Sequence, residues 1–164
     1  MDISHQQILI RLLAAVLIGL LYGMERKRRL KPVGKRTHLL ICLSCTVLTI
    51  ISAYGFSEFT AVGAPNDPAR LMVGILTGIG FIGGGIIWRG SAGIVQGVTT
   101  AASMLLLASL GIAIGLGLYF LAGVAAIIGF IALEGNSWAD LLRNRQTNDT
   151  MPYMEEGISA QEEE

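Results

Sequence analysis

The sequence predicts an all-α, polytopic membrane protein in which five transmembrane helices form a bundle with glycine-rich helix packing. Of its 164 residues, 52% are hydrophobic and 15% are charged, whereas soluble domains carry about 25% charged residues. Five apolar segments approach the roughly 20 residues that a helix needs to cross a bilayer. Their expected ranges are 8–24, 37–55, 70–88, 94–114 and 116–133, which together make a transmembrane domain over residues 1–133.

The first segment is expected to remain in the protein as a membrane anchor. A cleaved leader carries its basic residues before the apolar run, whereas here "ERKRRLKPVGKR" follows it. The fourth and fifth segments are separated only by "GLG", so Gly115–Gly117 is expected to form a very tight turn.

Residues 134–164 differ in character from the transmembrane domain. "SWADLLRNR" has a capping-box spacing between Ser137 and Asp140, and it predicts a short interfacial helix. The polar, acidic stretch that follows has little to pack and is expected to form a disordered cytoplasmic tail.

The distribution of charge predicts the orientation in the membrane. The first connecting loop holds seven basic residues and one acid, the second holds no base, and Arg143 and Arg145 follow the fifth segment. Because Lys and Arg near membrane ends stay on the cytoplasmic side, we expect the N-terminus outside and the C-terminus in the cytoplasm. The charge pattern contains no basic surface of the size that nucleic-acid binding needs.

The stretch "GIGFIGGG", Gly78–Gly85, contains the letters of a dinucleotide-binding loop. That fingerprint requires an acid about 20 residues further on, and none occurs between Asp67 and Glu134. Glycine pairs four residues apart instead indicate helices packed at close range, with the third segment at the centre. An alternative is that this segment unwinds and its carbonyls coordinate a cation. The pairs are Gly19/Gly23, Gly74/Gly78, Gly80/Gly84, Gly93/Gly97 and Gly111/Gly115.

Several polar residues within or beside the segments carry open alternatives. Arg11 either reaches the headgroups or forms a salt bridge with Asp67 or Glu58. Glu25 is expected to pair with a cation such as Arg36 or Arg89. His38, Cys42 and Cys45 share one helix face, where the cysteines serve either as small packing residues or as part of a metal or redox site.

Other polar residues are expected to have structural roles. Thr37 is positioned to cap the second helix, and Asp67 followed by Pro68 is typical of a helix start. Asp67 is also the candidate ligand for an outer cation. No nucleophile–base pair, carboxylate pair or complete metal cluster is apparent, so no catalytic site is expected and the protein is predicted not to be an enzyme.

Taken in order, "ERKRR", "GKRTHLL", "DPARL", "GIGFIGGG" and "GVTTAAS" resemble the MgtC/SapB family of bacterial inner-membrane proteins. The resemblance implies five transmembrane helices and a role in magnesium homeostasis and adaptation to low Mg²⁺, with a link to virulence in some relatives. It implies no established cofactor. The motif positions in this sequence are Glu25, Arg26, Gly34, Arg36, Thr37, His38, Asp67, Arg70, Gly78, Gly80, Phe81, Gly83, Gly85, Gly97, Thr99 and Thr100.

The chain also departs from the longer family members, which add a folded cytoplasmic domain after the fifth helix.

The sequence supports two hypotheses for the function. The first is a non-enzymatic modulator of ion homeostasis that binds membrane lipids, itself or another membrane protein through its glycine-grooved helices. The alternative is a small transporter or channel for Mg²⁺ or another cation.

Overall fold

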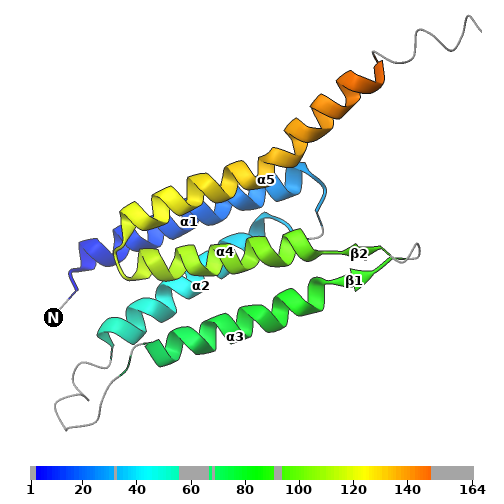
Figure 1. Cartoon of the computed structure of the whole chain (residues 1–164). Coiled ribbons are helices and arrows are strands. Elements are labelled where there is room, and N and C mark those ends of the chain that lie inside the picture. The colour runs from blue at the N-terminus through cyan, green and yellow to red at the C-terminus, as the bar shows by residue number, and fades with distance from the viewer. Residues whose placement is uncertain (1–2, 32, 56–66, 68, 91–93, 149–164) are drawn as a thin grey trace, which may run out of the picture. The chain divides into compact units, whose positions relative to one another are not determined.

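A computed structural model of the chain describes residues 3–31, 33–55, 67, 69–90 and 94–148, with the backbone alone for 136–148. The five helices of this part are α1 (His5–Arg28), α2 (Lys35–Tyr54), α3 (Ala69–Ile86), α4 (Val98–Gly115) and α5 (Tyr119–Asn148) (Figure 1). Helices α1 to α4 are each long and apolar enough to cross a membrane, and α5 has a shorter apolar stretch at Tyr119–Gly135. The predicted all-α, polytopic bundle is therefore confirmed.

The helix ends depart most from the predicted ranges at the start of α4 and the end of α5. A two-stranded antiparallel hairpin, β1 (Trp88–Arg89) and β2 (Val95–Gln96), stands between α3 and α4, so α4 begins at Val98 and not at Ile94. Helix α5 continues to Asn148 without interruption, and the short helix predicted near Ser137 is the continuation of α5. The predicted disordered tail beyond Asn148 lies outside the described residues.

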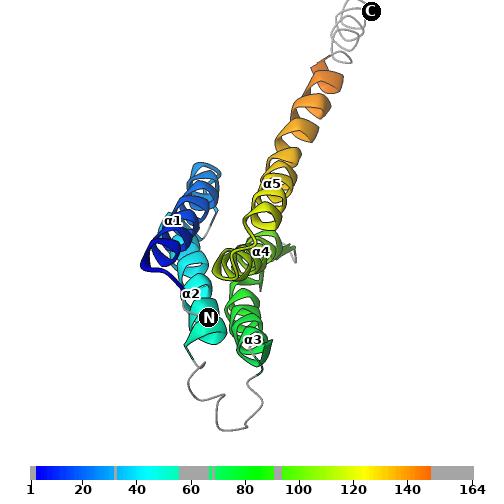
Figure 2. The ribbon, with the colours of Figure 1, turned by 90° about the vertical axis from the view of Figure 1, so that its left-hand side faces the viewer.

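The chain divides into two units, residues 1–127 and 128–164. Within the first unit, α4 contacts α1, α2 and α3, and Figure 2 shows α4 beside α3 and close to α2. Its Met104, Leu107 and Ala108 are fully buried. Of the most apolar 18-residue stretch in each helix, 56% is buried in α4 but only 17% is buried in α3. The expectation that the third segment is central is therefore wrong, because α4 occupies that position.

Two of the predicted glycine grooves hold the bundle together. A Cβ added at Gly19 would lie 2.7 Å from the Cα of Leu39, and one at Gly23 would collide with the Cα of Lys35. From α4, a Cβ at Gly111 would lie 2.6 Å from the carbonyl oxygen of Cys42. Since real Cβ atoms do not approach other atoms so closely, these glycines let α1 and α4 pack directly against the backbone of α2.

The glycines of α3 serve a different purpose from those of α1 and α4. A Cβ added at any of Gly74, Gly78, Gly80, Gly84 or Gly85 would meet nothing within 4 Å. Helix α3 is also continuous over Ala69–Ile86, and the positive-φ glycines of the described residues, Gly97 and Gly117, lie elsewhere. The glycine-rich helix is therefore neither the most closely packed nor unwound.

Candidate functional site

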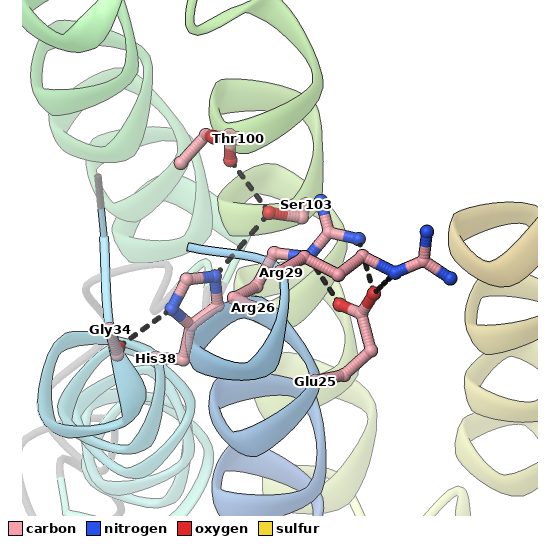
Figure 3. Close-up of polar contacts among 7 residues, drawn as sticks. All are labelled: Glu25, Arg26, Arg29, Gly34, His38, Thr100 and Ser103. Carbon is pink, nitrogen blue, oxygen red and sulfur yellow. Dashed lines mark hydrogen bonds and ion pairs between the residues drawn. The ribbon is translucent and has the colours of Figure 1, made fainter. Parts of the chain in front are cut away.

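A buried ionic cluster lies at the end of α1. Figure 3 shows the carboxylate of Glu25 bonded to the guanidinium groups of Arg26 and Arg29. Arg26 Nη2 donates to Glu25 Oε1 at 2.8 Å, and Arg29 Nε lies 2.7 Å from the same oxygen. The side chains of Glu25 and Arg26 are each 2% exposed. The predicted partners, Arg36 and Arg89, are instead exposed, so the pairing of Glu25 was predicted but its partner was not.

A second polar chain links the start of α2 to α4 (Figure 3). Fully buried His38 has Nδ1 3.0 Å from the carbonyl oxygen of Gly34 and Nε2 3.4 Å from Ser103 Oγ, and Ser103 donates to the carbonyl of Thr100 at 2.7 Å. Because a carbonyl only accepts, Nδ1 carries the hydrogen. Gly34, not Thr37, is the N-cap of α2, so the predicted capping role of Thr37 is wrong.

The hydroxyl groups between α2 and α4 are satisfied by backbone carbonyls. Thr46 Oγ1 lies 2.9 Å from the carbonyl oxygens of both Cys42 and Gly111, and Thr49 donates to the carbonyl of Cys45 at 2.7 Å. Both threonines are fully buried. The bond from Thr46 to Gly111 stabilises the close approach of α2 and α4, and both hydroxyls are used by carbonyls of the described residues.

The two cysteines lie in the same interface. Cys42 and Cys45 are buried, free thiols, and a Cβ at Gly111 would lie 2.8 Å from Cys45 Cβ. No group of three or more His, Cys, Asp or Glu side chains among the described residues could hold a metal ion. Their contacts are those of small packing residues.

Arg11 lies at the opposite end of α1 from Glu25 and is 7% exposed. Its Nη1 donates to the carbonyl of Gly115 at 2.6 Å and to the Tyr54 hydroxyl at 3.2 Å, and its guanidinium carbon is 5.2 Å from the centre of the Tyr54 ring. The side chain therefore binds the carbonyl of Gly115 at the C-terminus of α4 and does not extend to the surface. The predicted salt bridge to Asp67 is not among its contacts in the described residues, and Glu58 lies outside them.

A pocket of about 490 Å³ lies where the hairpin meets α4. It is lined by Lys31 from the loop after α1, by Trp88 and Gln96 from the hairpin, and by Thr99 and Thr100. Gly97, just before α4, has φ +88°, and a Cβ there would collide with the carbonyl oxygen of Ile86. The family motif containing Gly97, Thr99 and Thr100 thus shapes this pocket, whereas Lys31, Trp88 and Gln96 were missed, since nothing in the sequence separated them from their neighbours.

The remaining motif residues do not converge on one site. Asp67 accepts a 3.0 Å hydrogen bond from the backbone N–H of Ala69 and is exposed, as its predicted role in starting the helix requires. Gly83 packs against Ala101. Thr37 and Gly78 line a groove between α2 and α3. The side chains or backbones at Arg36, Arg70, Gly80, Phe81 and Gly85 are exposed.

These features define a polytopic α-helical membrane protein with a buried ionic cluster at one end of its bundle, a buried arginine at the other, and glycine contacts between helices. The model of the MgtC family matches residues 12–140. The chain belongs to the MgtC family, and the resemblance seen in its motifs is confirmed.

Three relatives illustrate the similarity. Protein SapB of Bacillus subtilis is 39% identical over 80% of this chain and 57% of its own length. The protein of Escherichia coli K12 named "Putative magnesium transporter YhiD" is 37% identical over 78% of this chain and 60% of its own length. Protein MgtC of Salmonella typhimurium is 37% identical over 73% of this chain and 48% of its own length. The chain thus spans about half to three fifths of these relatives, and no solved structure matches it.

Proposed function

We propose that this protein is a non-enzymatic membrane component of magnesium or ion homeostasis that acts by binding another transmembrane helix within the bilayer. Membership of the MgtC family and the magnesium transporter name of the E. coli relative support the link to magnesium. The match covers the membrane helices of this chain, so the proposal concerns what those helices do.

The observation that carries the binding role is the open face of α3. A groove of about 500 Å³ runs between α2 and α3, lined by apolar side chains and by Gly74 and Gly78. In the described part of the chain, no other segment comes within 4 Å of a Cβ added at either glycine. In lipid, helices associate through close van der Waals contact at small residues. The most favourable occupant is α3 of a second copy, because such a helix brings the same smooth glycine face to the contact.

Paired substitutions test this association. Gly74→Leu with Gly78→Leu fills the groove, whereas Gly80→Leu with Gly84→Leu adds the same bulk on the other side of the helix. Cross-linking in native membranes and single-molecule counting in lipid discs should give oligomers for the wild type and the control, and monomers for the groove variant. Oligomers that persist in the groove variant, or a monomeric wild type, would contradict the proposal.

We further propose that the protein lies in the bacterial inner membrane with its N-terminus outside. The seven basic residues between α1 and α2 support a cytoplasmic position for that loop. Cysteine accessibility measures this directly in a background with both native cysteines replaced by alanine. A cysteine at Lys27 should be labelled by an impermeant reagent only after the cells are lysed.

The second candidate is a small transporter or channel for Mg²⁺, which the name of the E. coli relative favours. The purified protein in liposomes, assayed for Mg²⁺ flux alongside Asp67→Asn, separates the two functions. Flux above empty vesicles that is lost in Asp67→Asn would favour transport. Equal leakage from empty and protein-containing vesicles would favour the modulator.

A further inference from the structure

The pocket beside the hairpin has features that the proposed function does not use. It lies outside the groove on α3, at the end of the bundle where α3 ends and α4 begins. Four separate segments meet there: the loop after α1, both strands of the hairpin and the first turn of α4. It is therefore a concave site built by the fold and not a single exposed loop.

The N-terminus of α4 opens into this pocket without a cap. Its N-cap is Gly97, which has no side chain, and its first turn contains no acid. The backbone bonding of α4 begins when Ala101 N–H donates to the carbonyl of Gly97 at 2.9 Å. The preceding amides of Val98, Thr99 and Thr100 have no acceptor within the described part of the chain. Such amides and the helix dipole together attract an anion.

Thr100 contributes a side-chain hydroxyl to the same pocket. Its residue is only 2% exposed, and it lines the pocket. Its carbonyl accepts from Ser103, but its hydroxyl has no hydrogen-bond partner among the described residues. Because the residue lines the pocket, a ligand there would supply an acceptor for this hydroxyl.

Lys31 adds a positive charge to the same cavity. The loop that carries it is fixed, because Lys31 N–H donates to the carbonyl of Arg26 and Leu30 N–H to that of Lys27, each at 3.1 Å. Leu30 has φ 52°, and these bonds together form a Schellman motif. No acid lines the pocket, and the sequence has none between Asp67 and Glu134. The electrostatic environment therefore favours an anion over a cation.

We propose that this pocket binds a phosphate group. A phosphate has enough oxygen atoms to accept together from the free amides of α4, the Thr100 hydroxyl and the Lys31 ammonium, which a smaller anion could not do. The pocket lies where the membrane-crossing helices end, so the phosphate comes from a phospholipid headgroup or from free phosphate in solution. Both sources offer the same chemistry to the same residues.

Trp88 provides a direct measurement, because it lines the pocket and is one of two tryptophans. In a Trp138→Phe background, its fluorescence reports binding to the full chain in maltoside micelles, which contain no phosphate. Three titrations are compared: inorganic phosphate, dioleoyl phosphatidylglycerol, and dioleoylglycerol as the lipid with the same acyl chains and no phosphate. A saturable response to phosphate or to the phospholipid, with none to dioleoylglycerol, is expected. A response to the phospholipid alone identifies a lipid site, and a response to both identifies a general phosphate site.

Substitutions test whether the named residues make the contacts. Lys31→Gln and Thr100→Val should each weaken binding about tenfold, the loss of one charge-assisted hydrogen bond. Lys27→Gln removes an equal charge from the same helix end but does not line the pocket, and Thr100→Ser keeps the hydroxyl. Both controls should stay within about twofold of the wild type, since neither removes a contact. Absence of any saturable response, or losses as large for Lys27→Gln as for Lys31→Gln, would overturn the proposal.

Discussion

Glu25 and Arg26 are neighbours in the chain and form a buried ion pair with each other, each side chain only 2% exposed. Adjacent residues on a helix ordinarily point in different directions. Here the Arg26 guanidinium contacts both oxygens of the Glu25 carboxylate, and Arg29 contacts one of the same two oxygens. The cluster therefore places one acid between two bases at the end of α1.

Replacing Glu25 by glutamine should destabilise the protein strongly. The change leaves the Arg26 charge buried without a carboxylate, and breaking a buried ion pair in this way costs about 3–5 kcal/mol. Arg29 will contribute less, since its side chain is 22% exposed and can reach water. Unfolding of the purified protein in mixed maltoside and dodecyl sulfate micelles measures the loss.

The matching control is the double variant Glu25→Gln with Arg26→Met. It removes both buried charges and should recover at least about 1 kcal/mol of the loss, which appears as a coupling energy in a double-mutant cycle. Additive losses would mean that the two residues act independently.

Alanine substitutions should separate the two kinds of glycine. Gly111→Ala places a Cβ 2.6 Å from the Cys42 carbonyl oxygen, and such overpacking costs about 1–3 kcal/mol. Gly78→Ala meets nothing within 4 Å and should stabilise the isolated bundle by about 0.5–1 kcal/mol, because alanine favours helix. The same micelle unfolding assay compares them, and equal effects would show that the assigned packing is incorrect.

Arg11 should stabilise the end of α4. Arg11→Met removes the bonds to the Gly115 carbonyl and the Tyr54 hydroxyl, with an expected loss of about 2 kcal/mol. Arg11→Lys keeps a positive charge near the C-terminus of α4, but lysine has fewer N–H donors than arginine. This variant should therefore retain only part of the stability. A methionine variant as stable as the wild type would show that these bonds contribute nothing net.

The backbone at Leu30 is strained, and a substitution can relieve that strain. Its φ of 52° lies in the left-handed region, where a residue with a Cβ costs about 1–2 kcal/mol relative to glycine. Leu30→Gly should therefore be more stable than Leu30→Ala by about 1 kcal/mol, a comparison that removes the effect of the leucine side chain. A less stable glycine variant would show that this turn is not a source of strain.

The sequence was sufficient for the class of fold, because uninterrupted apolar length is a direct physical requirement of a membrane helix. Gly19, Gly23, Gly111 and Gly115 occupy grooves as their spacing suggested. The same spacing led to the wrong expectation that α3 lies at the centre of the bundle. A glycine pattern shows that a helix can be approached closely, but it does not show whether a neighbouring helix is there. Only the arrangement of helices distinguishes Gly111 from Gly78.

The candidate sites were less accessible to sequence reasoning. Glu25 stood out as an acid among bases, but its pairing with Arg26 depends on side-chain folding that spacing does not encode. Thr99 and Thr100 were noted as a motif, whereas the pocket also needs Lys31, which a Schellman turn brings to it from a distant part of the chain. The hairpin escaped notice because its strands are two residues each.

The glycine contacts also decide which parts of the bundle can move. Helices α1 and α4 touch the backbone of α2 so closely that sliding along it would drive main-chain atoms together. Helix α3 meets α4 at ordinary distances, with Gly83 3.4 Å from the Ala101 Cβ when given a Cβ of its own. Among helices α1 to α4, α3 is therefore the one whose displacement meets the least steric resistance.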